Sequence, residues 1–154
     1  MIFFLNQRLQ QFYLLYRAFS SVGSLEGQYF KATGKLAKFS EQNLADCVYG
    51  TVGTCNTGTY VDAFKWVNQN GIMSAESYPY FSGKILNVFS SIIKINNKYI
   101  QANGVGGVCK YNQSSNSLKD APVTGWTKVS QNPITNELIL KEAVSKVGPI
   151  SVGK

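Results

Sequence analysis

The sequence predicts an α+β fold in which helices predominate over short extended segments. Two stretches place apolar residues at spacings of three or four, which is typical of helices with one buried face. These apolar stripes consist of Phe19, Val22, Leu25 and Tyr29, and of Val61, Phe64 and Val67. Segments 123–129 and 148–152 are predicted to be extended, the second as the start of a strand. A length of 154 residues suits one domain with its own core.

The first stripe belongs to a helix that we expect to end at Gly34, because glycine readily adopts the left-handed conformation that closes a helix. Ser40 can cap a short second helix, since its side-chain oxygen can accept a hydrogen bond from a free backbone N–H group. Glu41 then lies in the first turn, where the helix dipole favours an acidic residue. Leu44 is expected to face the core and Cys47 to end this helix.

The second stripe predicts a third helix over residues 60–70, closed by Gly71. The Gly- and Thr-rich segment 48–58 and the polar segment 112–120 are predicted to be loops. A fourth helix is predicted over residues 137–147.

The net charge of +7 raises the question of nucleic-acid binding. Five of the fifteen basic residues lie in segments 1–17 and 81–107, which contain no acidic residue. The other ten bases are balanced by eight acids, and no nucleic-acid-binding motif accompanies them. We therefore expect no nucleic-acid partner. The sequence also lacks the run of about 18 apolar residues that a transmembrane helix needs, so no membrane span is expected.

Composition limits the chemistry that these residues can perform. The sequence contains no histidine, which excludes a Cys-His dyad, a Ser-His triad and any histidine-based metal site. The three cysteines, Cys47, Cys55 and Cys109, include no Cys-x-x-Cys pair and lack a fourth ligand, so their spacing does not suit zinc. We expect no metal and no cofactor. Asn112-Gln113-Ser114 fits the acceptor pattern for N-glycosylation, a short pattern that often arises by chance.

Four motifs together carry a family resemblance. The stretch 18–29 is followed by Ser40-Glu41-Gln42-Asn43-Leu44-Ala45-Asp46-Cys47, by Cys55-Asn56-Thr57-Gly58 and by Ser77-Tyr78-Pro79-Tyr80. In this order they resemble the papain-like cysteine peptidases, in particular the cathepsin L group. The resemblance implies a papain-like α+β fold, represented mainly by the helical subdomain with the beginning of the β-rich subdomain.

The resemblance also divides the chain. Residues 1–17 match nothing in the family, whereas residues 18–154 are expected to form a partial peptidase domain. Within this domain, residues 84–101 are expected to be an insertion, because the family joins the flanking segments by a short loop. Gly83-Lys84 and Gly153-Lys154 lie at the two later breaks, and their codons can spell a splice donor. Our hypothesis is that segments 1–17 and 84–101 and the last residue, Lys154, are translated introns without a selected fold.

For catalysis, the resemblance implies a cysteine endopeptidase whose catalytic residues this chain lacks. Tyr16 stands at the position of the family's nucleophilic cysteine. Gln10 falls at the position of the oxyanion-hole glutamine, by coincidence in a glutamine-rich segment. The family's histidine and asparagine would lie beyond Lys154, so the chain as written is expected to be incomplete and inactive. The alternative is a non-catalytic papain-like module that binds a peptide or a propeptide.

The resemblance assigns substrate binding to Thr57, Gly58, Thr59 and Tyr60. In the family a glycine turn here contacts an extended substrate through its backbone. Gly58 matches the second glycine of that turn, and Thr57 replaces the first. A plain loop that leads into a helix is an equally good interpretation of these four residues.

The resemblance further implies a disulfide between Cys47 and Cys109. Closing a loop of about 60 residues would stabilise the fold by roughly 4 kcal/mol. Two buried free thiols are the alternative. Cys55 would be the unpaired cysteine, because the position of its family partner holds Tyr13. A reactive Cys55 is disfavoured, since no basic neighbour is evident that would lower its pKa.

By family, the expected setting is lysosomal or secreted. The expected partners are a peptide or protein substrate, a propeptide or a protease inhibitor. Residues Met1–Leu5 resemble the opening of a signal peptide, but a basic region, a long apolar run and a cleavage site do not accompany them.

Overall fold

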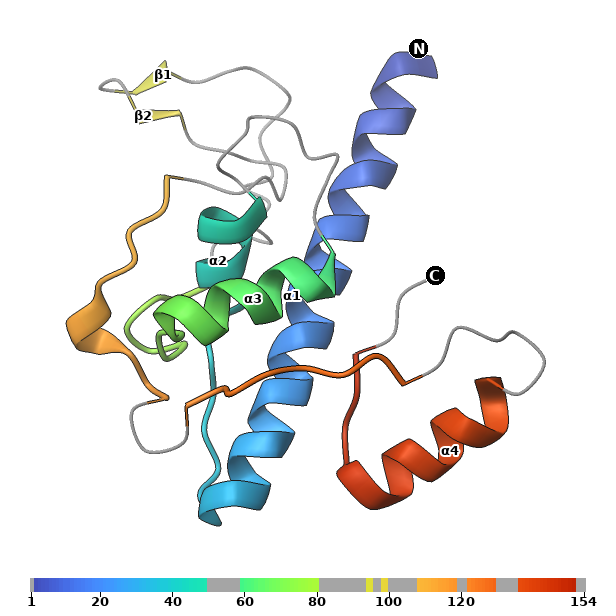
Figure 1. Cartoon of the computed structure of the whole chain (residues 1–154). Coiled ribbons are helices and arrows are strands. Elements are labelled where there is room, and N and C mark those ends of the chain that lie inside the picture. The colour runs from blue at the N-terminus through green and yellow to red at the C-terminus, as the bar shows by residue number, and fades with distance from the viewer. Residues whose placement is uncertain are drawn as a thin grey trace.

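The computed structural model describes residues 2–49, 59–80, 94–95, 98–99, 108–118, 122–129 and 136–151. Its helices are α1 (Ile2–Thr33), α2 (Glu41–Leu44), the π-helical turn η1 (Ala45–Tyr49), α3 (Tyr60–Asn70), the 3-10 turn η2 (Gln113–Ser115) and α4 (Asn136–Val147). Its strands are β1 (Lys94–Ile95) and β2 (Lys98–Tyr99). In Figure 1, α2 and α3 pack against the middle of α1, while α4 is set apart beside its C-terminal half.

Helix α1 buries one face against the rest of the molecule. The buried residues on this face are Ala18, Ser21, Val22, Leu25 and Tyr29. The predicted stripe is therefore confirmed at three of its four positions. Phe19 is the exception, because its side chain is 45% exposed and its ring meets that of Tyr80 edge-on at 5.3 Å. The reason is helical phase: Phe19 follows Ala18 by about 100° around the helix axis, which turns it away from the buried face.

The helical backbone of α1 continues without a break from Ile2 to Thr33. The division that the family resemblance places between residues 17 and 18 is therefore not visible as an end or kink of this helix. Residues 2–17 and 18–33 share one element, and the N-terminus of that element lies well before Tyr16.

The apolar core lies where α1, α2 and α3 meet. Besides the face of α1 it contains Phe39, Leu44, Ala63, Val67, Ile72 and Leu118. The rings of Tyr29 and Phe39 pack edge-to-face, with centroids 5.5 Å apart. Burying each large apolar side chain contributes about 2 kcal/mol, so this cluster is the main force that holds the helices together. The core position predicted for Leu44 is confirmed, and Phe64 packs against the cluster while half-buried.

Two glycines end helices as predicted. Gly34 follows α1 with a φ of 71°, and its N–H donates to the carbonyl of Phe30 at 2.7 Å. Gly71 follows α3 with a φ of 88°, and its N–H donates to the carbonyl of Val67 at 2.7 Å. Both angles lie in the left-handed region that residues with a Cβ rarely adopt.

The short helix α2 begins as predicted, but the helical structure ends later. The side-chain oxygen of Ser40 accepts a hydrogen bond from the N–H of Asn43 at 2.9 Å, which confirms the cap. The prediction that Cys47 ends the helix is wrong. The chain continues from Ala45 to Tyr49 as the wider turn η1, so Cys47 lies inside helical structure.

The prediction that residues 148–152 start a strand is wrong over the described part, residues 148–151, which carry no strand. Gly148, with a φ of 102°, turns the chain after α4. The Ser151 hydroxyl then donates to the carbonyl of Ser20 at 2.9 Å and lies 3.0 Å from Oγ of Ser24. A strand requires a neighbouring strand for its backbone hydrogen bonds. Here the neighbour is the side of helix α1.

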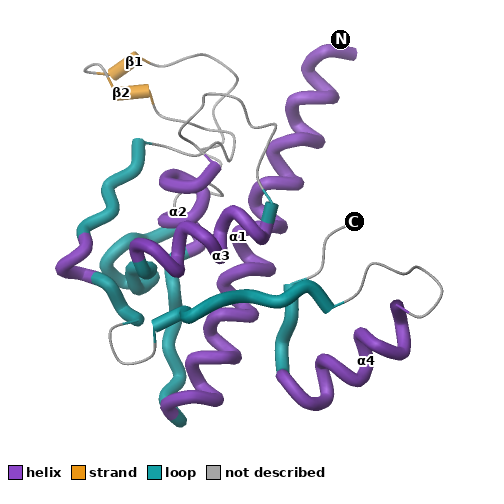
Figure 2. Tube along the Cα trace, in the orientation of Figure 1, coloured by secondary structure: helices purple, strands orange, loops and turns teal. Residues whose placement is uncertain are grey.

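Segment 122–129 crosses the molecule as a loop from the side of α3 toward the side of α4 (Figure 2). It forms no strand pairing, although residues 123–129 were predicted to be extended. The described sheet is the antiparallel pair of β1 and β2, with Lys94 opposite Tyr99 and Ile95 opposite Lys98. This small hairpin falls within the predicted insertion. None of the helices that the structure describes combines the length and the hydropathy that crossing a bilayer requires.

Candidate functional site

Tyr16, which the family resemblance assigns to the nucleophile position, lies inside α1, and its side chain is 72% exposed. Unpaired N–H groups and the positive end of the macrodipole occur at the first turn of a helix, which here starts at Ile2. The backbone around Tyr16 therefore offers no site that would stabilise a thiolate or an oxyanion. Gln10 belongs to the part of α1 whose side chains lie outside the described residues.

Two of the four predicted substrate-binding residues, Thr59 and Tyr60, lie at the N-terminus of α3. Thr59 caps the helix: its hydroxyl accepts from the N–H of Asp62 at 3.3 Å, and its own N–H donates to the Asp62 carboxylate at 2.6 Å. The hydroxyl and the N–H of Thr59 are thus hydrogen-bonded at the start of α3. This agrees with a loop that leads into a helix.

Tyr60 is half-buried, and its ring meets that of Phe64 edge-on with centroids 6.5 Å apart. Thr57, Gly58 and Cys55 lie outside the described residues.

The predicted disulfide is present in the structure. Cys47 of η1 is bonded to Cys109, with an S–S distance of 2.00 Å and 4.6 Å between the Cα atoms. Asn43, one turn earlier, is fully buried and its Nδ2 donates to Sγ of Cys47 at 3.3 Å. Its Oδ1 accepts from the N–H of Met73 at 3.1 Å. One buried amide therefore joins the disulfide to the segment after α3.

A buried hydrogen-bond network next to the disulfide was not predicted. The hydroxyl of Tyr78 donates to Oδ2 of Asp46 at 2.7 Å and accepts from the N–H of Lys110 at 3.2 Å. Gln42 Nε2 donates to the other oxygen of Asp46 at 2.8 Å. Burial, together with the bond to Asp46, raises the pKa of Tyr78 above its ordinary value. The phenol therefore keeps its proton at neutral pH and acts as a structural donor.

Sequence reasoning placed Asp46 and Tyr78 in two family motifs without relating them. They are 32 residues apart, and only tertiary packing brings them together. The available signal was only that an acidic residue and a tyrosine each fall within one of the four family motifs. That signal did not identify the pair.

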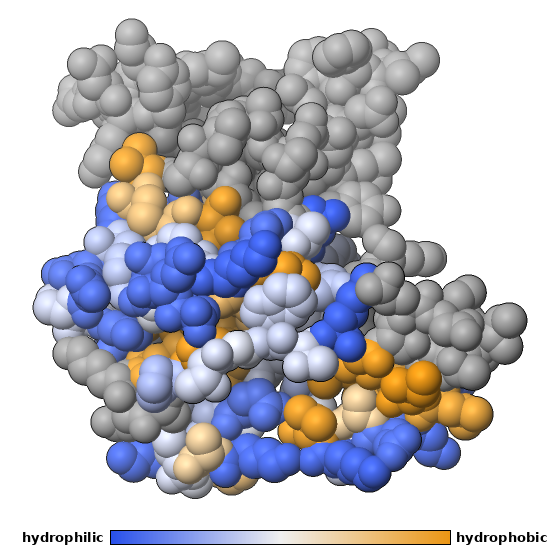
Figure 3. Space-filling model, in the orientation of Figure 1, coloured by the Kyte–Doolittle hydropathy of each residue, from blue (hydrophilic) through white to orange (hydrophobic). Residues whose placement is uncertain are grey.

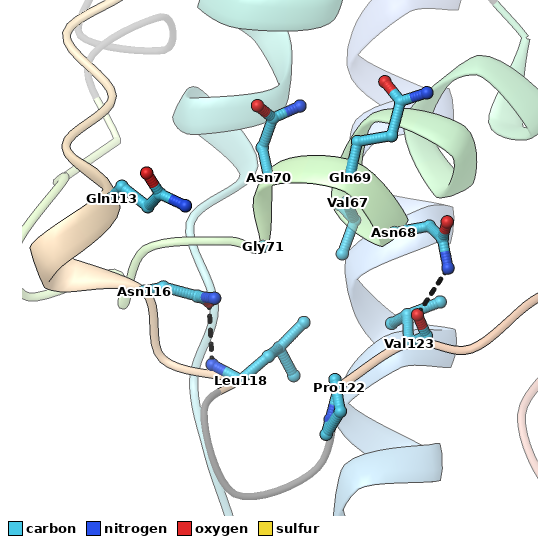
Figure 4. Close-up of a pocket in the computed structure, with 10 residues that line it drawn as sticks. All are labelled: Val67, Asn68, Gln69, Asn70, Gly71, Gln113, Asn116, Leu118, Pro122 and Val123. Carbon is cyan, nitrogen blue, oxygen red and sulfur yellow. Dashed lines mark hydrogen bonds between the residues drawn. The ribbon is translucent and has the colours of Figure 1, made fainter.

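A small cavity of about 120 Å³ lies at the end of α3 (Figure 4). Its polar lining comes from the amide side chains of Asn68, Gln69, Asn70, Gln113 and Asn116. Asn68 donates to the carbonyl of Val123 at 2.5 Å, and Asn116 accepts from the N–H of Leu118 at 3.0 Å. Neutral amides cannot act as an acid or a base, so the described lining of this cavity offers no group for proton transfer. Within the described ranges no three acidic, cysteine or histidine side chains gather where they could hold a metal ion.

Comparison with known proteins places these features in a family. A family model described as papain family cysteine protease matches residues 17–154. Mouse cathepsin K is 40% identical over 136 residues, and human cathepsin L2 is 40% identical over 138 residues. Each alignment covers 88% of this chain but only 32% and 33% of the respective relative. The chain thus spans about a third of the length of the curated relatives that it matches.

The fold comparison agrees. The structure of digestive procathepsin L 3 from the larval midgut of Tenebrio molitor superposes with a TM-score of 0.61 at 27% identity. The superposition covers 86% of this chain and 35% of that structure. The helix-rich arrangement described above therefore corresponds to one part of a larger fold.

Proposed function

Because the chain belongs to the papain family of cysteine proteases, we propose that these 154 residues form the helical part of a cathepsin L-like cysteine endopeptidase and do not cleave peptide bonds by themselves. The observation that carries the proposal is the position of Tyr16 in the interior of α1, in a chain without histidine. Similarity to cathepsins K and L2 supports the endopeptidase assignment of the whole protein.

The chemical argument concerns the nucleophile. Cysteine-peptidase catalysis needs a thiolate, a base that manages its proton and a group that orients this base. Tyr16 supplies a phenol instead of a thiol. Because α1 starts at Ile2, Tyr16 does not lie at a helix N-terminus. A histidine supplied from outside these residues would therefore still meet a phenol at this position.

Covalent labelling tests the missing nucleophile. The folded chain is incubated with a peptidyl epoxide that alkylates activated thiols, and its intact mass is measured over time. We expect no rapid adduct on the native chain. Denatured chain is the control, because any adduct on it reports the slow alkylation of a thiol that the fold does not activate. A rapid, stoichiometric adduct that forms only on the folded chain would contradict the proposal.

A non-catalytic binding module is the second candidate, and the half-buried ring of Tyr60 at the start of α3 favours it. Such a module would hold an extended peptide or a propeptide beside residues 57–60. Fluorescence anisotropy of a labelled extended peptide measures this binding directly. Binding that is lost in both Gly58→Trp and Tyr60→Ala but kept in Val61→Ala would support the module. The absence of binding at high chain concentration would rule out the binding module.

We also propose a lysosomal or secreted setting. The disulfide between Cys47 and Cys109 supports it, because such bonds persist in oxidising compartments. The partners would then be a peptide or protein substrate, a propeptide or a protease inhibitor. Pull-down by an immobilised propeptide, with and without excess free propeptide, would test the second of these.

A further inference from the structure

The segment that follows the disulfide presents an N-glycosylation acceptor at the surface, and we propose that Asn112 carries an N-linked glycan. Asn112-Gln113-Ser114 is the one Asn-x-Ser/Thr sequence in the 154 residues, with a middle residue other than proline. All three of these residues are exposed. The proposal concerns a modification, and it rests on the proposed lysosomal or secreted setting.

Residues on both sides of the acceptor are fixed to the core. Upstream, Cys109 is held by the disulfide, and the ring of Tyr111 packs edge-on against Trp66 with centroids 4.9 Å apart. Downstream, Oδ1 of Asn116 accepts from the N–H of Ile72 at 3.1 Å. The acceptor is therefore a short surface bulge, built around η2, between two anchored points. A glycan on it would extend into solvent without disturbing either anchor.

The local geometry leaves the reactive atom available. Oδ1 of Asn112 accepts two hydrogen bonds from Ser114, from its N–H at 3.1 Å and from its hydroxyl at 2.9 Å. Among the described residues, none accepts a hydrogen bond from Nδ2 of Asn112. The two bonds from Ser114 hold the side-chain amide of Asn112 in one orientation and leave Nδ2 without a hydrogen-bond acceptor among the described residues.

The reaction needs a sugar donor of a defined chemical class, an oligosaccharide bound to a polyprenyl diphosphate. Nδ2 of Asn112 forms a bond to the anomeric carbon of the sugar. The bond from that carbon to the diphosphate oxygen breaks, and the diphosphate leaves with the electron pair. One proton of Nδ2 passes to a base of the transferase. No electron transfer is involved.

The position of the site keeps other surfaces open. Residues 108–118 lie at the edge of the molecule opposite α4 (Figure 1). A glycan on Asn112 would therefore leave uncovered the apolar side chains over α4, at the lower right of Figure 3. Modification at this position adds a polar group without blocking that face.

The experiment expresses the full chain in eukaryotic cells behind a cleavable secretory leader. Only chains whose leader has been removed are counted, because these have crossed the membrane. Their mass is measured before and after peptide N-glycosidase, which removes the glycan and converts the modified asparagine to aspartate. The variants are Asn112→Gln and Ser114→Ala, which destroy the acceptor, and Ser114→Thr, which keeps its hydroxyl. Ser115→Ala is the matched control, since it removes the neighbouring hydroxyl.

We expect one glycan on the native chain, on Ser114→Thr and on Ser115→Ala, and none on Asn112→Gln or Ser114→Ala. Leader-free native chain without a glycan would overturn the proposal. A further variant combines Asn112→Gln with Pro122→Asn, which creates an Asn-Val-Thr acceptor in the exposed segment 122–129. A glycan on this variant but not on the native chain would show that Asn112 is not an acceptor. It would not contradict the proposed lysosomal or secreted setting.

Discussion

The hydroxyl group of Tyr78 joins three parts of the molecule. It donates to Asp46 of η1, accepts from the backbone of Lys110 beside the disulfide and belongs to the segment after α3. Its burial raises the pKa of the phenol, and the hydrogen bond to Asp46 adds to this rise. The pair therefore makes the stability of the fold depend on pH.

The free energy of unfolding should fall as the pH rises above about 10. In the unfolded chain a tyrosine titrates near pKa 10.0, whereas folded Tyr78 keeps its proton to higher pH. Above pH 10 the unfolded state therefore binds fewer protons than the folded state, and linkage lowers stability. Tyr80 and Tyr111 act in the same direction. Tyr78→Phe should weaken this dependence without abolishing it, as measured by urea unfolding at several pH values.

The same variant should also cost stability at neutral pH. Tyr78→Phe leaves the buried Asp46 and the N–H of Lys110 without this partner, a loss of about 1–3 kcal/mol. The exposed variant Tyr16→Phe is the control and should leave the stability at neutral pH unchanged. Equal effects of the two variants would show that the network is not the cause.

At the scale of elements, the disulfide ties η1 to the segment before η2 over a sequence separation of 62 residues. Cys47→Ser should lower the free energy of unfolding by about 4 kcal/mol on the chain-entropy model. Urea unfolding measures the loss, and reducing agent should produce a similar loss in the native chain. Cys55→Ser is the control, because Cys55 is the cysteine outside this bond. If Cys55→Ser cost as much as Cys47→Ser, the assignment of the pair would be wrong.

Helix α1 and the segment after α4 can lie in close contact because Gly27 of α1 has no Cβ. A Cβ at Gly27 would lie 2.7 Å from Cγ and Cδ of Pro149, whereas a Cβ at Gly23 would meet nothing within 4 Å. Gly27→Ala should therefore push residues 148–151 off the helix, at a cost of about 1–3 kcal/mol. Gly23→Ala should stabilise α1 by about 0.5–1 kcal/mol, because alanine favours helix. Urea unfolding of both variants checks this, and shifts of the same sign would contradict the contact.

The ends of the helices could be predicted where they depend on a single residue at that end. Gly34, Ser40 and Gly71 fix helix ends through their own backbone or side chain, and the sequence located each of them. The strand expected at 148–152 was wrong because strand formation depends on a partner elsewhere in the chain. The link between Asp46 and Tyr78 was missed for a similar reason, since their meeting depends on tertiary packing.

The molecule as a whole exposes apolar side chains around α4. Leu138 is 74% exposed and Val144 is 46% exposed, and apolar atoms gather over α4 in Figure 3. A groove of about 470 Å³ lies beside them, between the C-terminal half of α1 and Pro149. Large exposed apolar patches favour association. This surface fits a chain that spans about a third of its relatives.

We therefore expect the isolated chain to self-associate as its concentration rises. Sedimentation velocity measures this directly. Leu138→Lys combined with Val144→Lys should shift the chain toward monomer, because it replaces two of the exposed apolar side chains of α4 by charge. Thr127→Lys combined with Thr124→Lys adds the same charge on the exposed loop 122–129 and is the control. If both double variants shifted the chain toward monomer equally, the cause would be net charge and not the loss of apolar surface on α4.

The central claim is that these residues fold as part of a cysteine peptidase without its catalytic centre. Its most direct test is the hydrolysis of a fluorogenic peptide by the native chain and by Tyr16→Cys, side by side. Tyr16→Cys supplies a thiol but neither a helix N-terminus nor a histidine. We expect both to hydrolyse the peptide no faster than buffer does. Hydrolysis by either protein that disappears on unfolding would contradict the claim.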